Sequence, residues 1–128
     1  MYGANAYSTY KSNSVNYASK EQLLLMLLEG ACKYVKIGRQ AILDKDMNKA
    51  HDNLVKTQDI FYELMVTLDV AQGGEWAQNL FKVYDFVARR LTDANIKKDL
   101  KIVDEVIPLI EDIKDMWNEA YKISKEAK

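Results

Sequence analysis

Residues 73–95 read GGEWAQNLFKVYDFVARRLTDAN, and this segment predicts both a helix and the point where it begins. Gly73 and Gly74 interrupt the chain where a positive φ is easily adopted, and Glu75 favours the positive end of a helix. Small and apolar residues then recur at three- and four-residue intervals, so they share one helical face. This face consists of Ala77, Leu80, Tyr84, Val87, Leu91 and Ala94. We therefore expect a helix that reaches about Asn95 and buries this face in a core.

Two further helical segments precede this one. Ser19 and Gln22 have the spacing of a capping box at the start of the first segment, which runs to about Leu43. The polar turn 44–46 follows, and Asp46 is a suitable N-cap for the second segment. The second segment carries Ala50, Leu54, Phe61, Leu64 and Leu68 at helical spacing. Because the turn is so short, we expect the first two helices to be antiparallel neighbours.

A fourth helix is expected after the polar link 95–99. Its apolar residues form two rows, Val103, Val106, Ile110, Ile113, Trp117 and Ala120 in one and Ile102, Leu109, Met116 and Ile123 in the other. We expect the first row, with Trp117, to be buried. Pro108 removes one helical hydrogen bond, but the apolar period continues in phase on both sides, so a single helix is predicted.

These segments predict an all-α fold, an antiparallel up-and-down four-helix bundle over residues 19–123. Residues 1–18 are rich in Asn, Ser and Tyr without a sustained period, so they are interpreted as a flexible N-terminal arm. Residues 124–128 are left as a short C-terminal tail.

The composition argues against several classes of function. Charged residues make up 29% of the chain but give a net charge of only -1, so we expect no nucleic-acid partner. The longest apolar run, Leu23 to Leu28, is far shorter than the roughly 20 residues that span a bilayer, so no membrane insertion is expected. One cysteine and no secretory signal predict a cytoplasmic location.

Several helices carry more apolar residues than a core requires. A bundle helix needs an apolar stripe only a little over 100° wide, yet residues 23–28 are apolar on every side. Residues 60–66 and the row through Ile102, Leu109 and Met116 repeat this excess. Such surface is typical of a groove for a partner segment, but it is equally compatible with packing on neighbouring helices or with a structural homodimer.

His51 is the one residue suited to chemistry. A lone histidine on a four-helix bundle is similar to the reactive residue of phosphotransfer domains, so a histidine phosphotransfer domain is kept as an alternative. Those domains carry a lysine three residues later and then a glycine, whereas Leu54 and Val55 stand here. A di-iron bundle needs paired Glu-x-x-His motifs, which one histidine cannot supply. We expect no metal, no cofactor and no enzymatic activity.

Several stretches, in the right order, resemble the flagellar secretion chaperone family, usually called FliS. Residues 18–42, with the leucine run followed by EGA, resemble the family's opening helix. The motif GGEWA at 73–77, followed within the same helix by NL, YD, RRL and AN, is the most specific match. Residues 104–117, from DEV to the tryptophan, resemble the last helix, and Tyr7 and Tyr10 match a tyrosine-bearing arm.

The resemblance implies a cytoplasmic bundle that binds the disordered C-terminal segment of flagellin and prevents its premature polymerisation. It also implies a role in delivery to the export gate of the flagellar type III apparatus. The bound segment is expected to form helices whose apolar faces lie in grooves on the bundle. We expect arm contacts from Tyr7 and Tyr10 and groove contacts from Leu25, Leu28, Tyr62, Met65, Leu109 and Met116. A weak homodimer stays open as an alternative use of the same surface.

Overall fold

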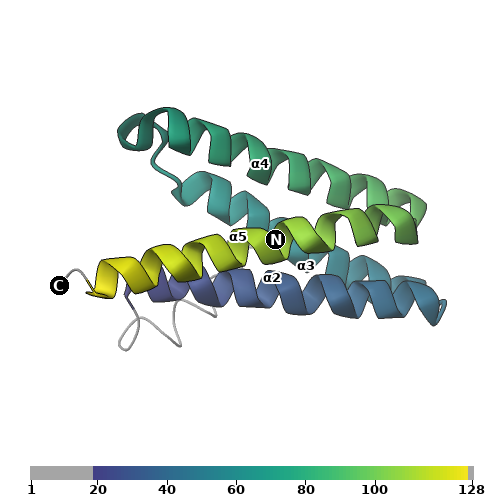
Figure 1. Ribbon diagram of the computed structural model, residues 1–128. Coiled ribbons are helices and arrows are strands. Elements are labelled where there is room, and N and C mark those ends of the chain that lie inside the picture. The colour runs from purple at the N-terminus through teal and green to yellow at the C-terminus, as the bar shows by residue number, and fades with distance from the viewer. Residues whose placement is uncertain (1–18, 127–128) are drawn as a thin grey trace.

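The computed structural model describes residues 19–126, and these form an antiparallel four-helix bundle (Figure 1). The helices are α2 (Lys20–Leu43), α3 (Met47–Thr67), α4 (Val70–Lys97) and α5 (Leu100–Glu126). Within this part of the chain α2 packs on α3 and α5, α4 packs on the same two helices, and the diagonal pairs do not approach each other. The predicted fold class is therefore confirmed. Helix α5 continues three residues beyond the expected end at 123.

Side-chain caps begin the first three helices, as elementary helix chemistry requires. Ser19 and Gln22 form the predicted capping box: the Ser19 N–H donates to Gln22 Oε1 over 2.8 Å, and the Gln22 N–H donates to Ser19 Oγ over 3.2 Å. The Asp46 carboxylate accepts from the Lys49 N–H, as predicted for α3. Asp69 accepts in the same way from the Gln72 N–H. These acceptors satisfy donors that the first helical turn leaves free.

Helix α4 begins earlier than predicted. The Asp69 cap allows one helical turn to form over residues 70–73, so the expected start at Glu75 is wrong by five residues. The predicted interruption is nevertheless present, because Gly74 has φ 61° and ψ -142° and kinks the helix at that point. Side chains with a Cβ rarely adopt this conformation, which explains why a glycine stands there.

The core follows the predicted faces closely. All six residues of the α4 face are buried, and so are Val103, Val106, Ile110 and Ile113 of α5. Trp117 is partly buried and packs against this core, as expected of a structural residue, whereas Ala120 is exposed. Buried residues on α5 end at Ile113, and Trp117 packs on the edge of the core one turn later. The helix continues through Pro108, which lies on an exposed position.

Polar contacts hold together one end of the bundle. At the end that contains turns 44–46 and 98–99, Arg39 of α2 pairs with Asp104 of α5, and Arg90 of α4 pairs with Glu105. The side chains of His51 and Asn95 join α3 to α4 nearby. Figure 1 shows α4 standing away from α5 toward the opposite end, where α4 begins and α5 finishes.

The kink in α4 gives a first prediction. Replacing Gly74 by Ala puts a Cβ on a residue with positive φ, and such backbone strain costs about 1–3 kcal/mol. We therefore expect Gly74→Ala to lower the free energy of unfolding by that amount in urea titrations. The exposed Gln72→Ala, in the same turn, should change it by less than about 0.5 kcal/mol. Equal stability of Gly74→Ala and the unmodified protein would show that alanine adopts the backbone conformation of this kink without strain.

Candidate functional site

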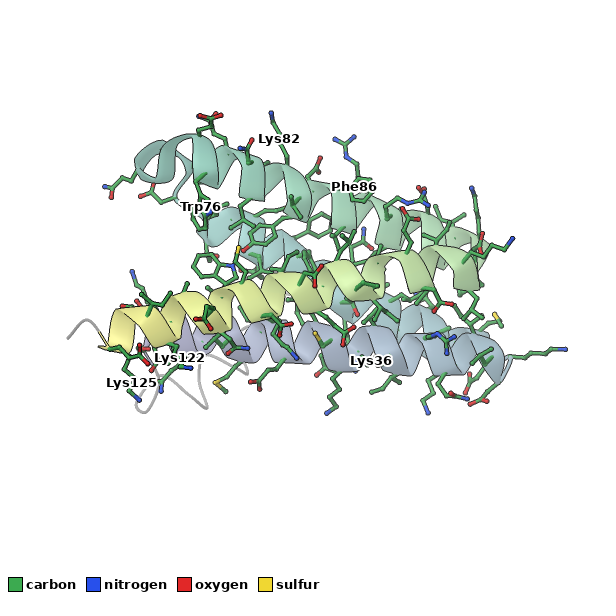
Figure 2. All side chains as sticks on the ribbon, in the orientation of Figure 1. Lys36, Trp76, Lys82, Phe86, Lys122 and Lys125 are labelled. Atoms are coloured by element: carbon green, nitrogen blue, oxygen red, sulfur yellow. The ribbon has the colours of Figure 1, made fainter. Side chains whose placement is uncertain are left out.

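Apolar side chains of α4 and α5 lie along the surface where the two helices meet, and we call this apolar surface the α4/α5 groove. The α4 wall carries Trp76, Val83 and Phe86, whose exposed fractions are 53%, 39% and 46%. They precede Arg90 by 14, 7 and 4 residues, so they share the side of α4 from which Arg90 reaches Glu105 of α5. Figure 2 shows Trp76 on the side of α4 turned toward α5, with Lys82 on the outer side.

The α5 wall is the second apolar row of the sequence. Its exposed fraction is 6% at Ile102, intermediate at Leu109 and Met116, and 58% at Ile123. The increase follows the separation of α5 from α4 along the bundle (Figure 1). Because an α-helix drifts by about 20° per seven residues, this row also rotates gradually away from the core. The apolar side chains of this surface are therefore most exposed toward Trp76 on α4 and Ile123 on α5.

An aromatic chain connects the groove to the core. The rings of Trp76 and Trp117 meet edge to face with centroids 5.6 Å apart. The Trp117 indole N–H donates to the Tyr84 hydroxyl over 2.9 Å, and the Tyr84 ring meets Phe61 of α3 edge to face at 5.9 Å. Burial raises the pKa of Tyr84 to about 12, although the hydrogen bond from Trp117 acts in the opposite direction. Tyr84 is therefore held as a neutral phenol.

A second apolar surface lies on the other flank of α4, where it meets α3. Tyr62 is half-exposed and Met65 half-buried, while Val66 is 79% exposed. Tyr62 belongs to the α4 side of α3, because Gln58, one turn earlier, donates both to the Tyr62 hydroxyl and to Thr92 of α4. Phe81 lies three turns before Thr92 on the same side of α4. A hollow of about 340 Å³ on the first half of α4 is lined by Val70, Gln78, Phe81 and Lys82.

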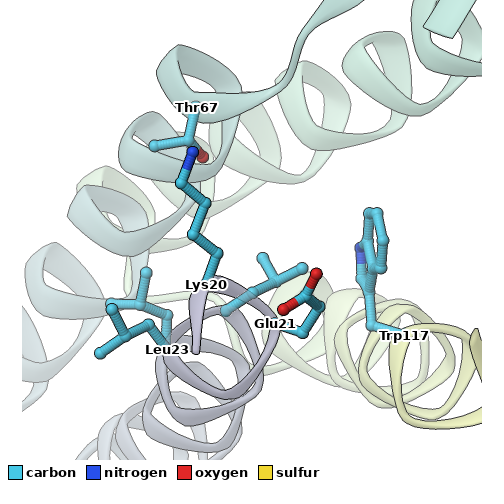
Figure 3. Close-up of a pocket in the computed structure, with 7 residues that line it drawn as sticks. Lys20, Glu21, Leu23, Thr67 and Trp117 are labelled. Atoms are coloured by element: carbon cyan, nitrogen blue, oxygen red, sulfur yellow. The ribbon is translucent and has the colours of Figure 1, made fainter. Parts of the chain in front are cut away.

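A larger pocket opens at the same end of the bundle, beside the first turns of α2 (Figure 3). Its volume is about 450 Å³, and its lining consists of Lys20, Glu21, Leu23, Leu24, Leu27, Thr67 and Trp117. The leucines come from the all-round apolar segment 23–28. Trp117 thus lies between this pocket and the α4/α5 groove, which it reaches through Trp76.

The predicted groove residues fall into three groups. Tyr62 and Met65 lie on the α3 flank of α4, and Leu109 and Met116 lie on its α5 flank, so these four surround one helix. Tyr7 and Tyr10 lie outside the described residues. Leu25 is half-buried and shares a face of α2 with Cys32 and Arg39, the side that meets α5, so it lies outside both surfaces beside α4.

Leu28 requires a correction. It is fully buried in the core, with an exposed fraction of 0%, so it is not available to a partner in this conformation. The reason is positional: of the run 23–28, only Leu27 and Leu28 reach the level at which α2 is enclosed by its neighbours. The all-round apolar pattern could not separate them from the residues closer to the open end.

Trp76, Val83 and Phe86 were missed by the sequence reasoning. They form a second apolar row on α4, beside the core face, at intervals of seven and three residues. The same kind of second row was recognised on the last helix. Its counterpart on α4 could have been found by asking which apolar residues remained after the core face was assigned.

His51 lies at an exposed position of α3, where its ring contacts Asn95 of α4. Its side chain is exposed, and Nδ1 lies 3.0 Å from the Asn95 side-chain nitrogen. Across residues 19–126, no group of three or more His, Cys, Asp or Glu side chains could hold a metal ion. The helices of this part of the chain also include none long and apolar enough to cross a membrane.

The aromatic chain predicts how stability depends on pH. An unfolded tyrosine ionises near pH 10, whereas folded Tyr84 stays neutral to about pH 12. Raising the pH from 10 to 12 therefore ionises the unfolded state first, and the free energy of unfolding falls. In the Tyr84→Phe variant, the free energy of unfolding should fall less over this range. At pH 7 the variant should be less stable than the unmodified protein by about 1 kcal/mol, because it loses the Trp117 hydrogen bond.

Urea unfolding at pH 8 and at pH 11 measures this difference. Tyr121→Phe, on the last turns of α5, is the matched control and should follow the unmodified protein. Parallel loss of stability in the Tyr84→Phe variant and the unmodified protein would contradict the assignment of a protonated Tyr84.

Comparison with known proteins identifies the family. The family model described as flagellar protein FliS matches residues 3–124. The chain is 37% identical to the flagellar secretion chaperone FliS of Bacillus subtilis, over 95% of this chain and 90% of that protein. It is 33% identical to the protein of the same name from Salmonella typhimurium, over 93% of this chain and 92% of that protein.

Structural comparison gives the same result. The fold is similar to the crystal structure of a flagellar chaperone from bacteria, with a TM-score of 0.74 and 17% identity over 93% of this chain and 97% of that one. The family model spans nearly the whole chain, from before the first described helix to the last turns of α5. The chain therefore belongs to the FliS family of flagellar proteins.

Proposed function

We propose that this protein is a cytoplasmic chaperone that binds the C-terminal segment of flagellin and prevents its premature polymerisation. It then assists delivery of the subunit to the flagellar type III export apparatus. The observation that carries this proposal is the apolar surface on both flanks of α4, which the bundle leaves uncovered among the described residues. Membership in a family whose relatives are named flagellar secretion chaperones supports the same role.

The mechanism is folding of the partner coupled to its binding. A disordered segment gains helical structure as its apolar face enters a groove, and the energy of burial compensates for the ordering. The α4/α5 groove suits such a segment because both of its walls run along helices and its aromatic side chains offer a large contact area. The protein acts by covering surface, so this role requires no catalytic group and no cofactor.

The proposed contacts combine both flanks of α4 with the arm. They are Trp76, Val83, Phe86, Leu109 and Met116 in the α4/α5 groove, Tyr62 and Met65 on the α3 flank, and Tyr7 and Tyr10 from the arm. Tyrosines suit an arm of this kind because the ring can lie on apolar surface while the hydroxyl remains in water.

A direct test uses calorimetric titration of the full chain with a peptide of the flagellin C-terminal region. We expect one-to-one binding, and we expect Val83→Asn/Phe86→Asn to weaken it at least tenfold. Full burial of an apolar side chain contributes about 1.5–3 kcal/mol, and these two residues retain roughly half of their exposure for a partner to cover.

Ile96→Asn is the matched control, because Ile96 is 75% exposed on α4 but lies beyond Arg90, outside the groove. The Ile96→Asn variant should bind the flagellin peptide with the same affinity as the unmodified protein. Absence of binding by the unmodified chain would contradict the proposed function. Binding that survives in the double variant would instead move the site away from the α4/α5 groove.

The homodimer alternative is distinguished by mass in solution. Light scattering of the free chain and of the chain with peptide separates the cases, because a dimer that uses the same surface must dissociate when the peptide binds.

A further inference from the structure

Helix α5 carries an acidic row parallel to its exposed apolar row. The apolar row is Ile102, Leu109, Met116 and Ile123, and the acidic row is Glu105, Asp112, Glu119 and Glu126. Each acidic residue follows an apolar one by three positions, and both rows repeat every seven residues. Residues three apart are neighbours on a helix surface, so the two rows run side by side along α5.

The acidic row borders the α4/α5 groove. Glu105 is the reference point, because its Oε2 lies 2.6 Å from Arg90 Nη2 of α4. Asp112 and Glu119 occupy the same side of α5 one and two heptads later, where both are exposed. Arg90 compensates Glu105, whereas no ion pair of residues 19–126 involves Asp112, Glu119 or Glu126.

The opposite wall supplies no compensating charge in the open part of the groove. It consists of Trp76, Val83 and Phe86, which are aromatic or aliphatic. The nearest lysine of that stretch, Lys82, lies on the outer side of α4 (Figure 2). The open groove therefore has a neutral apolar wall on α4 and a negatively charged edge on α5.

We propose that this acidic edge selects and orients the helix that docks in the groove, by pairing with basic side chains beside the apolar row of the flagellin segment. This inference rests on the proposed function for the identity of the occupant. The open part of the row, from Leu109 to Ile123, is about 21 Å long and fits a helix of roughly 15 residues. Lysine or arginine must then recur in the bound helix at about seven-residue intervals, on one side of its apolar stripe.

The charges set orientation more than total affinity. Apolar contacts alone allow a helix to enter the groove in either direction or shifted by a turn, because they lack direction. Pairing with a one-sided row of carboxylates distinguishes these arrangements, since a reversed helix places its basic residues against the neutral α4 wall. Each exposed pair contributes only about a two- to fivefold change in affinity, and salt weakens it.

The experiment measures affinity of the full chain for the flagellin C-terminal peptide at about 50 mM and about 500 mM salt. Asp112→Asn/Glu119→Gln should bind roughly 4- to 25-fold more weakly than the unmodified protein at low salt. At high salt the two affinities should converge. Both substitutions are isosteric and lie at exposed positions, so the fold should be retained, as circular dichroism can check.

Glu29→Gln/Asp52→Asn is the matched control, with the same change in net charge at exposed positions outside the groove. Asp52 lies on α3, and Glu29 lies on α2, which does not pack on α4. The control should bind as the unmodified protein does. Equal losses in both double variants, or an equal salt dependence of the groove variant and the unmodified protein, would overturn the inference while leaving the proposed function intact.

Failure of the flagellin peptide to bind the unmodified chain would instead remove the proposed function. The acidic edge is then tested with two designed helical peptides of about 15 residues, one with a leucine row flanked by lysines and one with glutamines in place of the lysines. The unmodified chain should prefer the lysine peptide several-fold at low salt, and Asp112→Asn/Glu119→Gln should show no preference. No preference by the unmodified chain would overturn the inference.

Discussion

A helix in a four-helix bundle touches two neighbours, so it can bury only one stripe of its surface. On α4 this stripe is filled by the row that runs from Ala77 to Ala94, and every member is buried. Trp76, Val83 and Phe86 are additional to it, and so is Phe81 on the other flank. Apolar residues beyond the stripe cannot enter the core of the same bundle. Their exposure beside α5 and α3 is therefore a direct consequence of the sequence of α4.

The sequence predicted most of the fold because its determinants are local. The capping box at Ser19, the Asp46 cap and the buried face of α4 depend on spacing within a few turns, and each is present in the structure. The start of α4 was misjudged because a glycine pair was read as a terminus, whereas the Asp69 cap adds a turn before the kink. Ala120 was misjudged as a member of the core row because helical period cannot tell where along its length a helix leaves the core.

The candidate site could be predicted only in part for the same reason. Excess apolar residues drew attention to Tyr62, Met65, Leu109 and Met116, which lie on the two flanks of α4. Leu28 has the same local pattern but is enclosed. What separates these residues is how far their helices are enclosed by neighbouring helices at that level of the bundle, and this depends on contacts between segments distant in sequence. The pairing of Arg90 with Glu105 joins α4 to α5 at one end of the bundle. Neither helix alone predicts that the two separate toward the other end.

The two ends of the bundle are held together by different contacts. Arg39–Asp104 and Arg90–Glu105 join α5 to both of its neighbours at one end. At the other end, the rings of Trp76 and Trp117 meet edge to face, and Trp117 donates a hydrogen bond to Tyr84. Trp117 also lines the pocket beside α2. Trp76 is thus in contact with Trp117, which lines the pocket beside α2 and donates to Tyr84 in the core, whereas ion pairs join the helices at the other end.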